Sequence, residues 1–207
     1  MDHVLNTFEM LMDRGGYVMI PLLILSVCSV ALIIERICFW LSLTGRSHLE
    51  RLDGLNSALQ SGQADRAREM VAGDSSPYGR VVNRMLDDGT SDAVAMQAVD
   101  SIRSGLDRYM VVLSTIITAA PLLGILGTVI GIIQSFQLLG SQSTLTDPRE
   151  VAGGIASALI TTAFGLIVAL VTLFPYMVFK AQSSNAIGRL ETLIASAQGG
   201  LGGKHGE

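Results

Sequence analysis

The chain has 207 residues, of which 49% are hydrophobic and 15% charged, and its formal net charge is −4. Acidic and basic residues are interleaved, so nothing favours a nucleic-acid-binding protein. Two cysteines and three widely separated histidines indicate neither a disulfide framework nor a metal site. The sequence also shows no nucleophile–base set and no phosphate-binding glycine loop, so we expect no enzymatic activity and no cofactor.

Residues 1–16 predict a periplasmic amphipathic helix. Apolar side chains recur there at helical spacing between polar ones, namely at Val4, Leu5, Phe8, Leu11 and Met12. Such a stripe is typical of a helix that lies in the plane of a membrane interface. Gly15-Gly16 ends this segment.

Residues 17–43 predict the first transmembrane helix, because the stretch from Val18 to Ile34 carries no charge. A cleaved signal peptide starts with basic residues and ends at a cleavage site between small residues. Here Pro21 lies early in the run and Glu35-Arg36 follows it. We therefore expect this helix to be retained.

Residues 44–108 form the one hydrophilic block and predict a helical cytoplasmic domain. Ser47 followed by Glu50 matches a capping box at the start of a helix. Helices are predicted over three stretches: 47–60, 63–72 and 77–88. A last helix is predicted to begin at Thr90-Ser91-Asp92 and to continue without a break into the second span.

Two long uncharged runs dominate the rest of the chain: 38 residues from Tyr109 to Thr146 and 29 from Val151 to Phe179. A hydrocarbon core about 30 Å thick needs roughly 20 apolar residues per helical crossing, so both helices span it and extend beyond it. The predicted segments are transmembrane helix 2 (109–139), a periplasmic turn (140–150), transmembrane helix 3 (151–179) and a cytoplasmic tail (180–207). Pro121 predicts a kink in the second span, and the glycine-rich end from Gly199 is expected to fray.

Basic residues are distributed unevenly around these spans. Nine arginines lie between the first and second spans and three basic residues follow the third, whereas only Arg14 and Arg149 lie on the other side. The positive-inside rule therefore places the hydrophilic block and the C-terminus in the cytoplasm and the N-terminus outside. The predicted fold class is an all-α membrane protein with three transmembrane helices and a helical cytoplasmic domain.

Small residues form stripes along the second and third spans. In the third span they recur every fourth residue, at Gly153, Ser157, Thr161, Gly165 and Ala169. In the second span Gly124 lies one turn after Pro121 and Ala120, and Gly127 with Gly131 forms a GxxxG pair. Small side chains let helix backbones approach closely in a membrane. We expect these residues to pack helices, both within the chain and between copies of it.

Four hydroxyl residues lie within or beside these stripes: Thr128, Ser157, Thr161 and Thr162. A threonine in a membrane helix usually bonds back to a carbonyl one turn earlier, and Thr115, Thr118 and Thr172 are interpreted in that way. A ring of the four stripe hydroxyls would hydrate an ion pathway. A threonine hydroxyl does not ionise near neutrality, so any proton translocation needs a carboxylate from another chain.

The second span, Ala120-Pro121-Leu122-Leu123-Gly124-Ile125-Leu126-Gly127-Thr128, resembles the second-helix signature of the MotA/TolQ/ExbB proton-channel family. The third span, Gly153-Gly154-Ile155-Ala156-Ser157-Ala158-Leu159-Ile160-Thr161-Thr162-Ala163-Phe164-Gly165, resembles its third-helix signature. Ile34-Glu35-Arg36 and Leu106-Asp107-Arg108-Tyr109 are similar too. Three spans, an outside N-terminus and a short tail resemble the ExbB/TolQ branch.

The resemblance implies a homopentamer in the bacterial inner membrane, with the second and third helices lining a central pore. Single-span partners of the ExbD/TolR type would bring a membrane aspartate, and Thr128 and Thr162 match the pore threonines that surround it. Proton flow would drive work across the envelope, through a TonB/TolA-like protein as a further partner.

The chain departs from the family at Ser157, where many ExbB and TolQ proteins carry a glutamate. The sequence leaves open whether the ion is a proton or sodium and which pathway is energised. A passive oligomeric scaffold that anchors periplasmic proteins is the alternative, and it would not need a partner aspartate.

Overall fold

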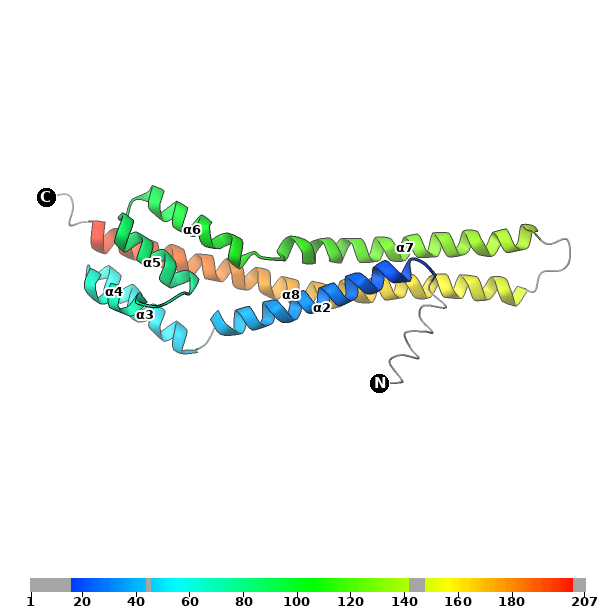
Figure 1. Ribbon diagram of the computed structural model, residues 1–207, viewed down its shortest axis with the longest axis horizontal. Coiled ribbons are helices and arrows are strands. Elements are labelled where there is room, and N and C mark those ends of the chain that lie inside the picture. Colours follow the sequence, from blue (N-terminus) through cyan, green and yellow to red (C-terminus); the bar gives the residue numbers. More distant parts are fainter. Residues whose placement is uncertain (1–15, 44–45, 142–147, 203–207) are drawn as a thin grey trace. The chain divides into compact units, whose positions relative to one another are not determined.

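The computed structural model describes residues 16–43, 46–141 and 148–202 (Figure 1). As predicted, the elements in this part of the chain are α-helices. In chain order they are α2 (Met19–Leu43), α3 (Arg46–Gln60), α4 (Ala64–Val71), α5 (Pro77–Asp88), α6 (Asp92–Leu106), α7 (Met110–Ser141) and α8 (Pro148–Gly202). Apart from Gly16, the predicted helix over residues 1–16 lies outside the described residues.

The chain divides into two compact units, each described here by itself. The apolar unit comprises Met1–Glu35 and Tyr109–Met177, and the hydrophilic unit comprises Arg36–Arg108 and Val178–Glu207. Helices α2 and α8 contribute to both units. The hydrophilic block of the sequence thus forms its own unit together with the C-terminal half of α8.

Three helices are long and apolar enough to cross a membrane: α2, α7 and α8. At about 1.5 Å per residue, the 32 residues of α7 extend about 48 Å and the 55 residues of α8 about 80 Å. Both exceed a hydrocarbon core of about 30 Å, as predicted. Helix α8 begins at Pro148, three residues before the predicted span, because proline is well suited to the first helical position.

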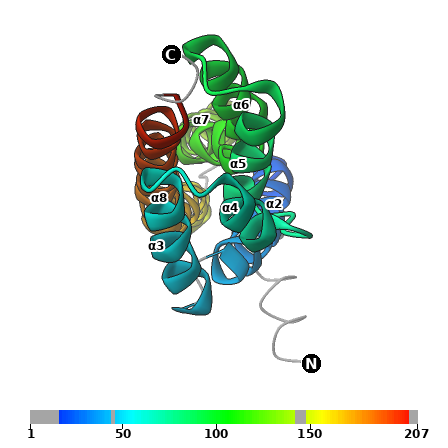
Figure 2. The same cartoon turned by 90° about the vertical axis from the view of Figure 1, so that its left-hand side faces the viewer.

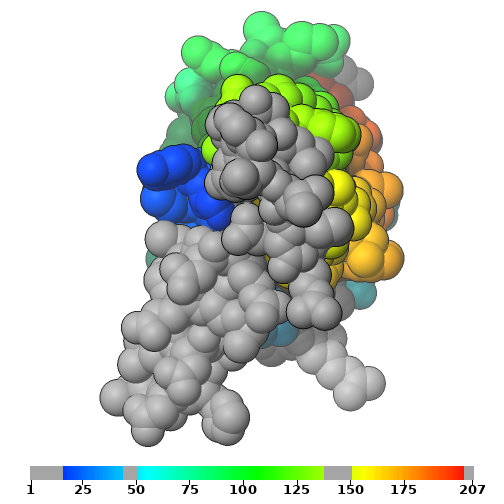
Figure 3. Space-filling view, turned by 90° about the vertical axis from the view of Figure 1, so that its right-hand side faces the viewer, coloured from blue at the N-terminus to red at the C-terminus, as the bar shows by residue number. Residues whose placement is uncertain are grey.

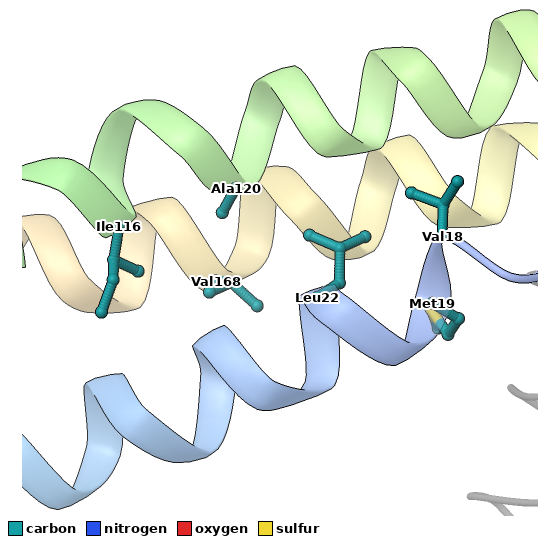
Figure 4. Packing of buried hydrophobic residues seen from close by; sticks show 6 residues of the cluster. All are labelled: Val18, Met19, Leu22, Ile116, Ala120 and Val168. Atoms are coloured by element: carbon teal, nitrogen blue, oxygen red, sulfur yellow. The ribbon is translucent and has the colours of Figure 1, made fainter.

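The core of the apolar unit forms where α2, α7 and α8 meet. Leu22 of α2 and Ala120 of α7 are fully buried, and Ile116 and Val168 are nearly so. Figure 4 shows that Val18, just before α2, and Leu22 in its first turn point toward the other two helices. The contact stabilises α2 against both long helices.

The described residues leave most of the apolar surface of this unit uncovered. Only 22%, 22% and 28% of the most apolar windows of α2, α7 and α8 are buried. Large side chains remain exposed on each helix, among them Val27, Val111, Leu122, Leu159 and Phe174. An exposed apolar surface of this kind is suited to contact with lipid or with further helices. Figure 3 shows the molecule from the end where α7 finishes and α8 begins.

The hydrophilic unit is a cluster of helices, α3 to α6, with the C-terminal half of α8 (Figure 2). The predicted helices over 63–72 and 77–88 are confirmed as α4 and α5. Ser76 caps α5 by accepting a hydrogen bond from the Gly79 amide at 3.1 Å. The predicted start at Ser91 is also confirmed, because its hydroxyl accepts from the Val94 amide and caps α6.

The capping box predicted at Ser47 is wrong in position. Helix α3 begins at Arg46, so Ser47 already lies in its first turn and cannot be the residue that precedes the helix. The end of the helix at Gln60 is as predicted.

The prediction of one continuous helix from Ser91 into the second span is also wrong. Helix α6 ends at Leu106 and α7 begins at Met110. Between them Tyr109 adopts φ +65°, a left-handed conformation that costs a residue with a Cβ about 1–3 kcal/mol. The break is stabilised by the Arg36 side chain, which binds the last carbonyls of α6.

Fraying from Gly199 is not observed, since α8 continues to Gly202. Gly200 lies against the backbone carbonyl of Leu59, and a Cβ at this position would overlap that oxygen. Glycine here allows close packing on the end of α3, which offsets its low helix propensity.

Candidate functional site

Glycines bring α7 and α8 into close contact inside the apolar unit. A Cβ on Gly165 would lie 2.5 Å from the Ala120 carbonyl oxygen, and one on Gly124 would lie 2.9 Å from the Thr162 Cα. Both neighbours are backbone atoms, which a side-chain rotation cannot move aside. The packing role predicted for these two glycines therefore has a clear structural basis.

The GxxxG pair of α7 lies in the same contact. A Cβ on Gly127 would meet the Thr161 methyl group at 2.6 Å, and one on Gly131 would meet the Ala158 Cβ at 2.6 Å. A Cβ on Gly153, by contrast, would have no described atom within 4 Å apart from its chain neighbours and the nearby backbone of its own helix. The packing predicted for Gly153 is not found within the described chain, because its neighbour Gly154 faces α7 and contacts the Ser135 hydroxyl instead.

Thr128 and Thr162 meet across this contact. The Thr162 hydroxyl donates to the Gly124 carbonyl at 2.8 Å and lies 3.4 Å from the Thr128 oxygen. The Thr128 hydroxyl donates to the Ile125 carbonyl at 2.6 Å. Each hydroxyl has one proton, and each proton has a short carbonyl acceptor within the protein. The two oxygens therefore present free lone pairs, which suit a proton donor or a hydrated cation.

Thr161 lies buried in the same α7–α8 contact. Its side chain is 1% exposed, its methyl group packs on Gly127, and its hydroxyl donates to the Ser157 carbonyl at 3.4 Å. Adjacent residues of a helix point about 100° apart. Thr161 therefore packs on Gly127 of α7, while the neighbouring Thr162 donates a hydrogen bond to the Gly124 carbonyl. Within the described chain Thr161 packs between α7 and α8, and its predicted place on an ion pathway stays a prediction.

Ser157 is half-buried and lines a cavity of about 260 Å³ within the apolar unit. Gln134 and Ser135 of α7 add polar groups to the same cavity. A water molecule occupies about 30 Å³ in the liquid, so this cavity is large enough for several. It lies one turn of α8 from Thr161. Its lining includes one carboxamide, at Gln134, and the hydroxyl residues Tyr17, Ser135 and Ser157.

Pro121 is partly buried one turn before Gly124, and α7 continues as a helix on both sides of it. Its ring removes one backbone donor from the helix. The kink predicted at this residue stays a prediction.

The sequence did not indicate the buried hydroxyl pair of Ser29 and Thr172, 2.6 Å apart on α2 and α8. Thr172 donates to the Val168 carbonyl at 2.7 Å, as its interpretation as a back-bonded threonine predicts, so Ser29 donates to Thr172. Both are almost completely buried. The only signal for this contact was a serine in the middle of the first uncharged run.

Neither α7 nor the membrane part of α8 supplies a group that ionises near neutrality. From Met110 to Ser141 and from Val151 to Phe179 there is no Asp, Glu, Lys, Arg or His. In the part of the chain that the structure describes, no cluster of three potential metal ligands is found. The chemistry of this site is that of hydroxyl, carboxamide and carbonyl oxygens.

Comparison with known proteins agrees with this architecture. The sequence model of the MotA/TolQ/ExbB proton channel family matches residues 67–192, more than half of the chain. An ExbB-like 3 biopolymer transport protein from Synechocystis is 32% identical over 173 residues, which cover 81% of this chain and 82% of the relative. The Tol-Pal system protein TolQ of Pseudomonas aeruginosa is 38% identical over 103 residues, which cover 49% of this chain and 43% of TolQ.

A biopolymer transport protein ExbB from Xanthomonas campestris is 31% identical over 135 residues, 65% of this chain and 52% of that protein. Two of these relatives are biopolymer transport proteins by name, and the family comprises channels rather than enzymes. The matched region contains α5, α6, α7 and the membrane part of α8, which carry the two threonines and the glycine contact. The chain belongs to the MotA/TolQ/ExbB proton channel family.

Proposed function

We propose that this chain is the pore-forming stator subunit of an ion-driven motor in the bacterial inner membrane. In this proposal several copies, five by resemblance, surround ExbD/TolR-like single-span partners that each carry a membrane aspartate. Proton motive force then energises transport or mechanical work across the envelope, with a TonB/TolA-like protein as the element that receives the force. The hydrophilic unit lies in the cytoplasm and the α7–α8 connection lies outside.

The observation that carries this proposal is the Thr128–Thr162 pair. Both hydroxyl protons are bonded to backbone carbonyls, so the two oxygens offer acceptor sites. A protonated carboxyl group is a donor that fits such sites, and the spans of this chain contain no carboxylate of their own. A partner aspartate that alternates between this polar site and a dry one would release and rebind its proton.

The magnitudes are compatible with such an engine. Insertion scales place the cost of a charged aspartate at the bilayer centre at roughly 2.5–3.5 kcal/mol, so its protonation state responds strongly to local hydration. One elementary charge that crosses 100 mV releases about 2.3 kcal/mol. Useful work therefore requires repeated ion passages through the same site.

The test is ion flux through proteoliposomes that contain the chain and a co-expressed single-span partner. Thr162→Val should lower the flux by about tenfold or more, since it removes one oxygen of the pair. Thr162→Ser keeps the hydroxyl and should retain most of the flux. Thr115→Val is the matched control, because the Thr115 hydroxyl is exposed and only bonds back to the Val111 carbonyl at 2.8 Å.

Native mass spectrometry of the same samples reports the number of subunits and the partner. Full flux in assembled Thr162→Val would contradict the proposal. The second candidate, a passive scaffold, is favoured by Ser157, which stands where the family resemblance implies a glutamate. It predicts an oligomer whose wild type passes no ions under either a proton or a sodium gradient.

A further inference from the structure

The break between α6 and α7 needs a cause outside its own sequence. Asp107, Arg108 and Tyr109 separate the two helices, and none of them is glycine or proline. Tyr109 nevertheless adopts φ +65°, which side chains with a Cβ rarely accept. The local sequence would allow α6 to continue into α7, so other contacts must favour the interruption.

Arg36 supplies one of these contacts from the other end of the hydrophilic block. Its side chain is 1% exposed, and its Nη1 donates to the carbonyls of Gly105 at 3.2 Å and Leu106 at 3.3 Å. The guanidinium carbon lies 4.4 Å from the centre of the Phe39 ring. The last carbonyls of a helix lack intrahelical donors and carry partial negative charge, so a buried cation stabilises the end of α6 at this residue.

Asp107 supplies a second contact, to α8. Its carboxylate accepts a hydrogen bond from the buried Ser183 hydroxyl at 2.7 Å. Its backbone amide donates to the Arg103 carbonyl at 2.9 Å and closes the last turn of α6. All these contacts lie within the hydrophilic unit, and they tie the segment before α7 to α2 on one side and to α8 on the other.

We propose that Arg36 is a positioning residue for the ion pathway: by capping α6 at Leu106 it sets the residue at which α7 begins. Only three residues separate the cap from Met110, and α7 is continuous from there to Thr128. A change in the start of α7 would therefore alter the helix that carries Thr128. This inference rests on the proposed function, and it gives a role to the two sequence motifs around Arg36 and Asp107.

The first test compares Arg36→Gln with Arg36→Lys and with Arg51→Gln, an exposed arginine of α3 that serves as the control. Hydrogen–deuterium exchange is measured on the assembled complex in its membrane mimic. In Arg36→Gln, amides of residues 104–110 should exchange about tenfold faster or more, with no change in α3 to α5. Ion flux should fall about tenfold or more, since the pathway threonines are displaced. Arg36→Lys keeps a donor and the charge, and it should recover part of both losses.

The second test separates positioning from general stability. Tyr109→Gly allows the left-handed conformation without strain, so the break can form with less help from Arg36. In the Arg36→Gln background, Tyr109→Gly should restore part of the flux. A residue that only stabilises the hydrophilic unit would not be rescued by a glycine at the start of α7.

Wild-type exchange and flux in assembled Arg36→Gln would overturn the proposal. It would also be overturned if Arg36→Lys showed the same exchange and flux as Arg36→Gln and Tyr109→Gly restored no flux. If Arg36→Gln fails to assemble, Arg36→Lys and Ser183→Ala carry the same comparison, and both are expected to raise exchange at 104–110. A wild type that passes no ions would refute the proposed function, whereas the exchange experiment would still decide whether Arg36 caps α6.

Discussion

Two glycines of the same stripe on α8 should respond in opposite ways to the same substitution. Gly153 and Gly165 both belong to the row that repeats every fourth residue. A Cβ at position 165 would lie 2.5 Å from the Ala120 carbonyl oxygen, whereas position 153 has open space beside it among the described residues. Replacement by alanine therefore forces α7 and α8 apart only at Gly165.

The magnitude follows from two opposing effects. Overpacking a well-packed contact costs about 1–3 kcal/mol, and glycine to alanine in a helix gains about 1 kcal/mol. The helix gain is common to both variants and cancels in their difference. Gly165→Ala should thus be less stable than Gly153→Ala by about 1–3 kcal/mol, or roughly 5- to 150-fold in the unfolding equilibrium.

The assay is reversible unfolding in mixed detergent micelles, followed by helical circular dichroism, on both variants and the wild type. Gly153→Ala should be as stable as the wild type or slightly more stable. Equal stability of the two variants, or a less stable Gly153→Ala, would refute the close approach of α7 and α8 at Ala120.

Two further predictions concern other contacts. Thr172→Val should destabilise the fold by about 0.6–1.7 kcal/mol, because the buried Ser29 hydroxyl loses its acceptor. The double variant Ser29→Ala/Thr172→Val should lose less unfolding free energy than the sum of the two single variants, and this result would confirm the pair. Burial raises the pKa of the Tyr78 phenol above its ordinary value of 10.0, and the hydrogen bond and charge of Arg189 oppose this shift. The folded state therefore holds that proton more tightly than the unfolded state, so stability is constant below about pH 10 and falls as the pH rises toward the folded-state pKa. Tyr78→Phe should lose less stability than the wild type between pH 9 and 11, as measured by chemical unfolding at each pH, and parallel curves would contradict the burial of this hydroxyl.

The sequence was sufficient for the features that depend on one segment at a time. Uncharged runs predicted the three spans, because a bilayer requires apolar side chains over a known length. Ser91, within the predicted start at Thr90-Ser91-Asp92, caps α6, since capping is a local hydrogen bond. The spacing of small residues also predicted that α7 and α8 pack closely.

The tertiary structure decided which members of those patterns carry the contacts. Thr161 and Thr162 are neighbours in sequence, yet only Thr162 meets Thr128, because the rotation of α8 about its axis depends on its fit against α7. Likewise, among the described residues a Cβ would overlap another helix at Gly165 but not at Gly153. No local signal distinguishes them, since the difference lies in the partner helix.

The end of α6 shows the same dependence at longer range. The local sequence of Asp107-Arg108-Tyr109 would allow a continuing helix, yet α6 ends at Leu106. Arg36, about seventy residues earlier, donates to the carbonyls of Gly105 and Leu106 at this end. Helix propensity and hydrophobic periodicity act over a few turns, so they determine where helices can form. Where a helix stops against its propensity is decided by hydrogen bonds from residues that only the folded chain brings together.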